Sequence, residues 1–117
     1  MPLASSTLHT TASDLARFGV RLASQIRAGG PWAVMAEPEV LVAEEGDRSL
    51  SWGLGLGLVR AGSRSFVYHG GNNVIFIADF VYGVDDNLGY ALLTNSANGQ
   101  RVVDALERRV FGRVLRH

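Results

Sequence analysis

The sequence predicts an α+β fold, in which an antiparallel sheet of about four strands is flanked by an N-terminal and a C-terminal helix. Apolar residues recur every three or four positions in residues 11–28 and 99–115, which is the period of a helix with one buried face. Between residues 49 and 95, short apolar stretches separated by turn-forming residues are typical of strands. Helices gathered on an antiparallel sheet define the α+β class, and 117 residues suit a single domain, residues 1–117.

The first helix is predicted over residues 11–28. Thr11, followed three positions later by Asp14, fits a capping box, with Ser13 as a competing cap. Residues 29–31, Gly-Gly-Pro, end the helix because glycine supplies the left-handed cap and proline cannot continue it. Its apolar face consists of residues spaced three or four apart: Leu15, Phe18, Leu22 and Ile26.

A connection and a glycine-rich strand are expected next. Residues 31–48 contain two prolines and are predicted to be irregular, with room for a short helical turn at residues 32–35. From residue 49 the period becomes two, which places Trp52 and three leucines on one side of a strand and glycines 53, 55 and 57 on the other. A face made only of glycine indicates that another group approaches the backbone there.

Three further strands and the second helix complete the predicted order. The strands are expected at residues 65–71, 74–82 and 90–95, with a turn-rich loop at 83–89. The strand at 74–82 is almost entirely apolar, which predicts a central position in the sheet. The last helix is predicted over residues 99–115, with an apolar stripe of valines and a leucine: Val102, Val103, Leu106 and Val110.

Composition excludes several classes of site. The chain has no cysteine and no lysine, so it offers no disulfide, no thiolate and no Ser-x-x-Lys nucleophile. Eleven basic and eleven acidic residues give a net charge of zero, which gives no indication of a nucleic acid or an anionic membrane as partner. The chain has no apolar run long enough to span a membrane, and residues 1–10 lack the pattern of a signal peptide. The sequence leaves the cellular compartment undetermined.

Neither metal nor triad chemistry has a supporting pattern. Histidines at positions 9, 69 and 117 are too scattered for a ligand pair, so no metal or other cofactor is expected. The acidic stretch at residues 85–87 could touch a cation, but such hairpin tips are usually solvated turns. His69 could serve a serine as a base, oriented by Asp79 or Asp85, although no spacing favours this arrangement. The glycine-rich residues 53–57 lack the Gly-Lys-Ser/Thr of a phosphate loop.

One local cluster, residues 68–73 (Tyr-His-Gly-Gly-Asn-Asn), could carry function. A polar side chain at a strand end, followed by glycines, presents a hydrogen-bond donor and an open backbone edge with which an extended substrate could pair. The simpler interpretation, which the local pattern by itself favours, is a strand that ends in a glycine turn beside an exposed histidine.

Four segments resemble one protein family in order and spacing. Residues 10–18, TTASDLARF, resemble the (S/T)TAxDLARF segment of penicillin-binding-protein-like serine hydrolases. That family includes class C β-lactamases, D-Ala-D-Ala carboxypeptidases and related esterases. Residues 52–55, WGLG, resemble its YGLGW strand, and residues 69–71, HGG, resemble its third active-site motif, Lys-Thr-Gly or His-x-Gly. Residues 92–99, LLTNSANG, resemble its VVLTNSxxG strand, so that the likeness covers nearly the whole chain.

The resemblance implies a role for each residue of the third motif. His69 would donate toward a substrate carboxylate or help move protons, and Gly71 would let the substrate approach. The backbone N–H of Asn72 would form part of the oxyanion hole. Gly70 stands where the family often has Thr or Ser, which disfavours a β-lactam or D-Ala-D-Ala substrate and leaves ester or amide substrates open.

The resemblance also implies that the chain is the C-terminal fragment of a β-lactamase/transpeptidase-like domain. The family's Ser-x-x-Lys and Tyr-x-Asn motifs are absent, so we expect no acyl transfer by these residues alone, and a small-molecule or peptide substrate only in a longer parent. Members of this family are often extracytoplasmic. The alternative is a stand-alone, non-enzymatic module for binding or self-association. In either case, unpaired strand edges predict a homodimer or a swapped oligomer.

Overall fold

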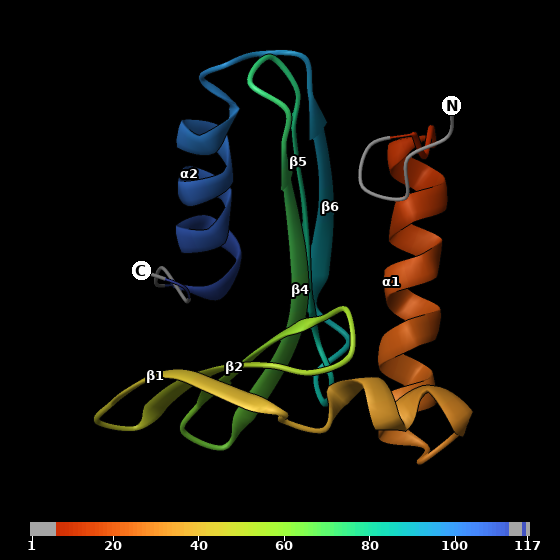
Figure 1. Ribbon diagram of the computed structural model, residues 1–117, viewed down its shortest axis with the longest axis vertical. Coiled ribbons are helices and arrows are strands. Elements are labelled where there is room, and N and C mark those ends of the chain that lie inside the picture. Colours follow the sequence, from red (N-terminus) through yellow and green to blue (C-terminus); the bar gives the residue numbers. More distant parts are fainter. Residues whose placement is uncertain (1–6, 113–115, 117) are drawn as a thin grey trace.

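The computed structural model describes residues 7–112 and Arg116 and has an α+β architecture (Figure 1). A six-stranded antiparallel sheet, in which each strand pairs with the next one along the chain, lies between two helices on opposite faces. The elements in order are α1 (Ala12–Arg27), the 3-10 helix η1 (Pro31–Ala36), β1 (Val40–Glu45), β2 (Arg48–Trp52), β3 (Gly57–Ala61), β4 (Arg64–Asn72), β5 (Ile77–Gly83), β6 (Gly89–Thr94) and α2 (Gly99–Phe111).

The sheet has six strands where about four were predicted, and both extra strands come from the first half of the sheet. β1 forms in the connection at residues 31–48, which was expected to be irregular. The short helical turn expected in this connection is present as η1. Every residue of β1 is exposed, so its sequence VLVAEE shows no alternation of apolar and polar residues that would predict a strand. Pairing with β2 defines the strand. The strand expected from residue 49 onward is divided into β2 and β3.

The prediction of a continuous glycine face is therefore wrong. Gly55 has a φ of +74° in the turn between β2 and β3, a conformation that interrupts a strand and that glycine adopts without strain. Two other glycines do face close neighbours from this chain. A Cβ at Gly53 would overlap the backbone carbonyl of Met35, and a Cβ at Gly57 would overlap the Tyr68 ring. The close approaches thus come from inside the fold.

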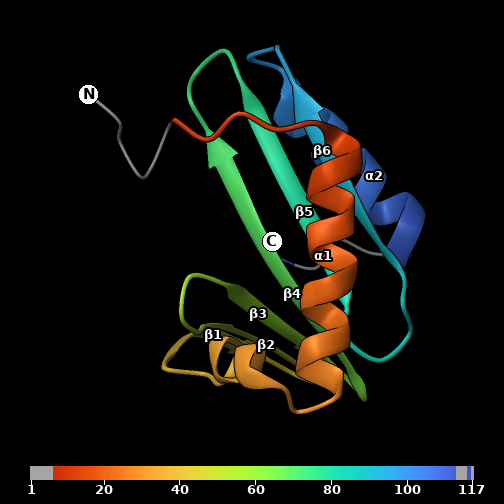
Figure 2. The same cartoon turned by 90° about the vertical axis from the view of Figure 1, so that its right-hand side faces the viewer.

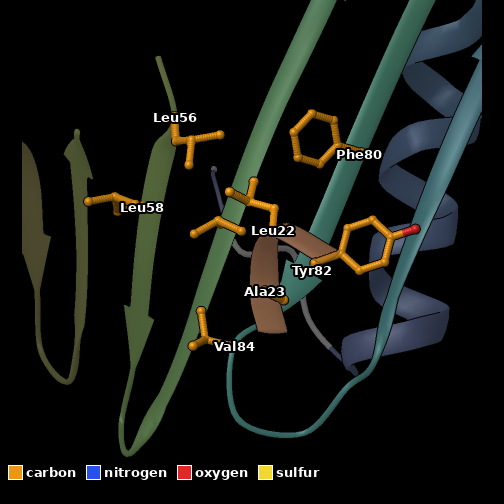
Figure 3. Packing of buried hydrophobic residues seen from close by; sticks show 8 residues of the cluster. Leu22, Ala23, Leu56, Leu58, Phe80, Tyr82 and Val84 are labelled. Carbon is orange, nitrogen blue, oxygen red and sulfur yellow. The ribbon is translucent and has the colours of Figure 1, made fainter. Parts of the chain in front are cut away.

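Helix α1 begins and ends as its sequence predicts and covers one face of the sheet. The Thr11 side chain caps it by accepting the Asp14 N–H at 3.1 Å, and Gly29 follows it with a φ of +69°. Leu22 is fully buried against the sheet, and the backbone approaches the Tyr82 ring so closely at Gly19 that a Cβ there would overlap the ring. Figure 3 shows the buried apolar residues of this face: Leu22, Ala23, Leu56, Leu58, Phe80, Tyr82 and Val84.

Helix α2 covers the opposite face. The Phe66 and Phe111 rings meet edge to face with their centroids 4.9 Å apart, and Val81 and Tyr90 complete this second cluster. The helix ends at Phe111 because Gly112 takes a left-handed φ of +76°, so it is shorter than predicted. The predicted end at residue 115 lies outside the described residues. The strand predicted at residues 74–82 forms as β5 from Ile77 onward, an interior strand between β4 and the edge strand β6, and six of its seven residues are buried.

Candidate functional site

The last part of β4 has a partner on one side only. β3 pairs with β4 as far as Gly57 opposite Tyr68, whereas β5 continues to Ile77 opposite Asn72. Among the described residues, no strand pairs with residues 69–72 on the side away from β5 (Figure 2). We call residues 69–72 the open edge of β4. An unpaired edge of this kind is a template on which an extended chain can add as a further strand.

Hydrogen-bond alternation shows which backbone groups face this side. The Asn73 N–H donates to the Phe76 carbonyl at 2.9 Å, and the Val84 N–H donates to the Ser65 carbonyl at 2.9 Å. Because antiparallel strands exchange hydrogen bonds at every second residue, these two contacts direct the odd-numbered positions of β4 toward β5. The N–H and C=O groups of Gly70 and Asn72 therefore point outward, along the open edge.

A hollow of about 370 Å³ adjoins the open edge on the side of the sheet that α2 covers. Three of the four residues predicted for the site, Gly70, Gly71 and Asn72, contribute to its wall. A Cβ on Gly70 would lie 3.4 Å from Asp79 Oδ1, and a Cβ on Gly71 would lie 3.8 Å from the nearest atom, so internal packing does not demand glycine at either position. The complete lining is Trp52, Tyr68, Gly70, Gly71, Asn72, Ala78, Asp79, Gln100 and Arg116.

His69 lies apart from the other three predicted site residues. Side chains alternate along a strand, so His69 projects from the face that carries α1, together with Val67. Its exposed ring lies edge-on to Trp52 at 5.9 Å between centroids, and it does not line the hollow. The triad considered from the sequence does not form either. Asp79 projects from the opposite face of the sheet, and Asp85 is exposed in the turn after β5.

Asp79 instead belongs to an ionic cluster beneath α2. The Tyr90 hydroxyl donates to Asp79 Oδ2 at 2.7 Å. Arg116 grips the same carboxylate with both terminal nitrogens, Nη1 to Oδ1 at 2.7 Å and Nη2 to Oδ2 at 2.8 Å, and its Nε donates to Glu107 Oε1 at 2.9 Å. The Tyr68 ring packs under the guanidinium, 4.8 Å from ring centroid to Cζ. We call Tyr68, Asp79, Tyr90 and Glu107 the guanidinium cage.

Two signals in the sequence could have indicated this cluster. Asp79 interrupts an otherwise apolar central strand. Glu107 lies four residues after Val103 and four before Phe111, on the stripe of α2 that is buried. Both carboxylates are buried, Asp79 at 3% exposure and Glu107 at 0%. Because burying an unpaired charge is costly, carboxylates at such positions predict a buried cationic partner.

The cluster shifts the pKa values of its members. Burial, followed by the neighbouring charge of Asp79, raises the pKa of the Tyr90 phenol strongly. For Arg116, burial acts to lower the pKa, but the hydrogen bonds and charge of Asp79 outweigh it and raise the pKa further. Burial also raises the pKa of Tyr68 and that of Tyr82, on the other face of the sheet. These shifts involve all three tyrosines of the chain.

Alkaline titration is expected to show that the tyrosines ionise at a higher pH in the folded chain than in the unfolded chain. Above the ordinary phenol pKa of 10.0, the unfolded chain loses protons that the folded chain keeps, so the free energy of unfolding falls as the pH rises above 10. Phenolate absorbance should therefore appear at a higher pH in the native chain than in the chain in denaturant. The chain in denaturant is the control and should titrate near its ordinary value. Phenolate formation near pH 10 in a chain that keeps its native dichroism would contradict this prediction.

No family model, curated protein or solved structure matches the chain. Within residues 7–112 and Arg116, no three histidine, aspartate or glutamate side chains gather as a metal site would require. Neither α1 nor α2 combines the length and apolar character that crossing a membrane demands.

Proposed function

We propose that this chain is the C-terminal sheet portion of a serine hydrolase related to the penicillin-binding proteins and β-lactamases, and that it forms one wall of the acyl-transfer site. The open edge of β4 carries this proposal, because the segment that resembles the family's third motif is also the segment that, among the described residues, has no strand partner on the side away from β5. An extended substrate could pair with the outward backbone groups of Gly70 and Asn72.

The outward N–H of Asn72 suits an oxyanion donor. A backbone amide held in a sheet needs no reorganisation as charge develops on an acyl oxygen, which is the property on which oxyanion stabilisation depends. Gly70 places no hydroxyl beside it to hold a substrate carboxylate. The substrates favoured are therefore esters or amides without such a carboxylate, rather than β-lactams or D-Ala peptides.

The nucleophile must come from polypeptide other than these 117 residues. A serine acylated with the help of a neighbouring lysine cannot arise in a chain without lysine. His69 does not replace this lysine, since it lies on the opposite face of the sheet from the hollow. Reading the coding sequence upstream of Met1 tests the proposal directly. An in-frame Ser-x-x-Lys and Tyr-x-Asn would support it, and their absence would contradict it.

The purified chain is expected to resist acylation by a fluorescent penicillin and by a fluorophosphonate probe. Oxyanion donors without a nucleophile form no covalent adduct, so no band should be labelled. A serine hydrolase of the same family, treated in parallel, is the positive control, and the heat-denatured chain reports nonspecific labelling. Mass spectrometry that located an adduct on a serine of the native chain would refute the proposed division of the site.

The exposed edge of β1 favours a second candidate, a self-association module. Val40 and Leu41 are each 60% exposed, and Val42 is 51% exposed, on the strand at the end of the sheet. Apolar side chains on an unpaired edge invite pairing with a second copy.

Light scattering is expected to give the mass of a homodimer, because two β1 edges can pair with each other. Leu41→Lys should shift the chain toward the monomer, since a charged side chain on an edge strand opposes pairing. Val102→Lys removes a comparably exposed apolar side chain from α2, away from this edge, and should leave the mass unchanged. A monomeric wild-type chain at high concentration would exclude this candidate.

A further inference from the structure

The guanidinium cage has the construction of a binding site. Its four side chains come from four elements, Tyr68 from β4, Asp79 from β5, Tyr90 from β6 and Glu107 from α2. None of these elements contains Arg116, which follows α2 in the chain. The Tyr90 hydroxyl holds the Asp79 carboxylate in place, and Tyr90 itself packs against Phe111 with centroids 6.1 Å apart. The folded core thus assembles the cage from residues other than Arg116. The Arg116 side chain occupies it from a segment outside these four elements, in the position that the guanidinium of a ligand would take.

The geometry of the cage selects a guanidinium over an ammonium. Asp79 receives two parallel N–H donors at 2.7 and 2.8 Å, the fork arrangement that a planar guanidinium provides and a lysine ammonium does not. Glu107 receives the third donor from the same plane, and the Tyr68 ring stacks on its face.

The hollow beside the open edge gives the cage an entrance. Arg116 and Asp79 both line the hollow, and 11% of the Arg116 side chain remains exposed. A volume of about 370 Å³ is roughly twelve times the ~30 Å³ that one water molecule occupies in the liquid, so the hollow has enough volume for an arginine side chain. An incoming guanidinium could reach Asp79 from the hollow while β5 and α2 keep their packing.

We propose that the guanidinium cage binds the arginine side chain of another molecule, and that Arg116 occupies it as an intramolecular competitor. The ligand class is an alkylguanidinium, either free or within a peptide that lies along the hollow. Guanidinium binding requires no acyl chemistry, so this proposal stands or falls separately from the hydrolase proposal. A purely structural ion pair makes a different prediction, since it offers no response to a guanidinium supplied in solution.

Chemical rescue of Arg116→Ala tests the proposal. Ethylguanidinium at millimolar concentration should raise the Tm of this variant by roughly 4 °C or more, because a ligand that binds only the folded state stabilises it. Ethylammonium at the same ionic strength should have no such effect. Arg109→Ala, which removes an exposed arginine from α2, is the matched control and should not respond. Equal effects of the two cations, or no effect of either, would overturn the proposal.

Two further measurements keep the test decisive. If Arg116→Ala is unfolded in buffer, far-ultraviolet circular dichroism should report refolding in ethylguanidinium and not in ethylammonium, and failure to refold in both would overturn the proposal. In the intact chain, an arginine-containing tetrapeptide should take the place of Arg116 in the cage and so shift the NMR resonance of the Arg116 Nε–H. Because the internal side chain competes, the apparent affinity of the intact chain should be at least about 10-fold weaker than that of Arg116→Ala. Equal affinities would place the peptide elsewhere and refute the competition.

Discussion

Asp79→Asn is expected to lower the free energy of unfolding by about 3–5 kcal/mol, the range measured when one partner of a buried ion pair is removed. The asparagine keeps the volume of the side chain but cannot accept two charged donors from Arg116. The guanidinium is then left buried beside Glu107 alone, and the Tyr90 hydroxyl loses a charged acceptor at 2.7 Å. Since a small domain is stable by only about 5–15 kcal/mol, urea denaturation should show a large shift of the midpoint.

Two comparisons separate this effect from the simple loss of a charge. Asp85→Asn removes an exposed carboxylate from the turn after β5 and should change stability by less than about 0.5 kcal/mol. Adding Arg116→Met and Glu107→Gln to Asp79→Asn removes all three charges of the cluster and should restore part of the lost stability, because a buried ionic network replaced on every side is nearly neutral. Equal midpoints for Asp79→Asn and Asp85→Asn would show that the ion pair contributes little to stability.

Local pattern was sufficient for the parts of the fold that obey short-range rules. Thr11 caps the start of α1 and Gly29 follows its end. Both could be predicted because capping and the left-handed conformation of glycine depend on a few neighbouring residues. The interior position of β5 followed from its sequence, which is apolar apart from Asp79. β1 could not be predicted in this way, since its six exposed residues carry no alternation and its strand state depends on pairing with β2.

The candidate site shows a similar division. The sequence indicated residues 69–72 as a group, and the structure places three of them beside one hollow. Strand alternation places His69 with Val67 on one face and Tyr68 on the other, but the sequence could not show which of the two faces carries the hollow. The partners of Asp79 and Glu107 were also hidden, since Arg116 contacts them across 37 and 9 positions of the chain. The packing of α2 on the sheet brings both carboxylates to the same guanidinium.

The open edge can be tested by replacing Asn72 with a residue that has no backbone N–H. Proline at position 72 lacks the backbone N–H, and strand edges that face solvent tolerate proline because no ladder hydrogen bond is lost there. The N–H of Asn72 points away from β5, as the alternation set by Asn73 and Phe76 requires. Asn72→Pro should therefore preserve the pairing of β4 with β5, which circular dichroism can verify.

In a longer protein that carries the Ser-x-x-Lys nucleophile, Asn72→Pro is expected to reduce the rate of acylation by about 10²–10³-fold, the usual effect of deleting one oxyanion donor. Asn72→Ala is the matched control. Both substitutions remove the side-chain oxygen that accepts the Val74 N–H at 2.9 Å, but only proline removes the backbone donor. Alanine should therefore acylate far faster than proline, and the rate of a fluorophosphonate reaction measures the difference. Equal rates for the two folded variants would mean that the outward amide of residue 72 does not contact the reacting oxygen.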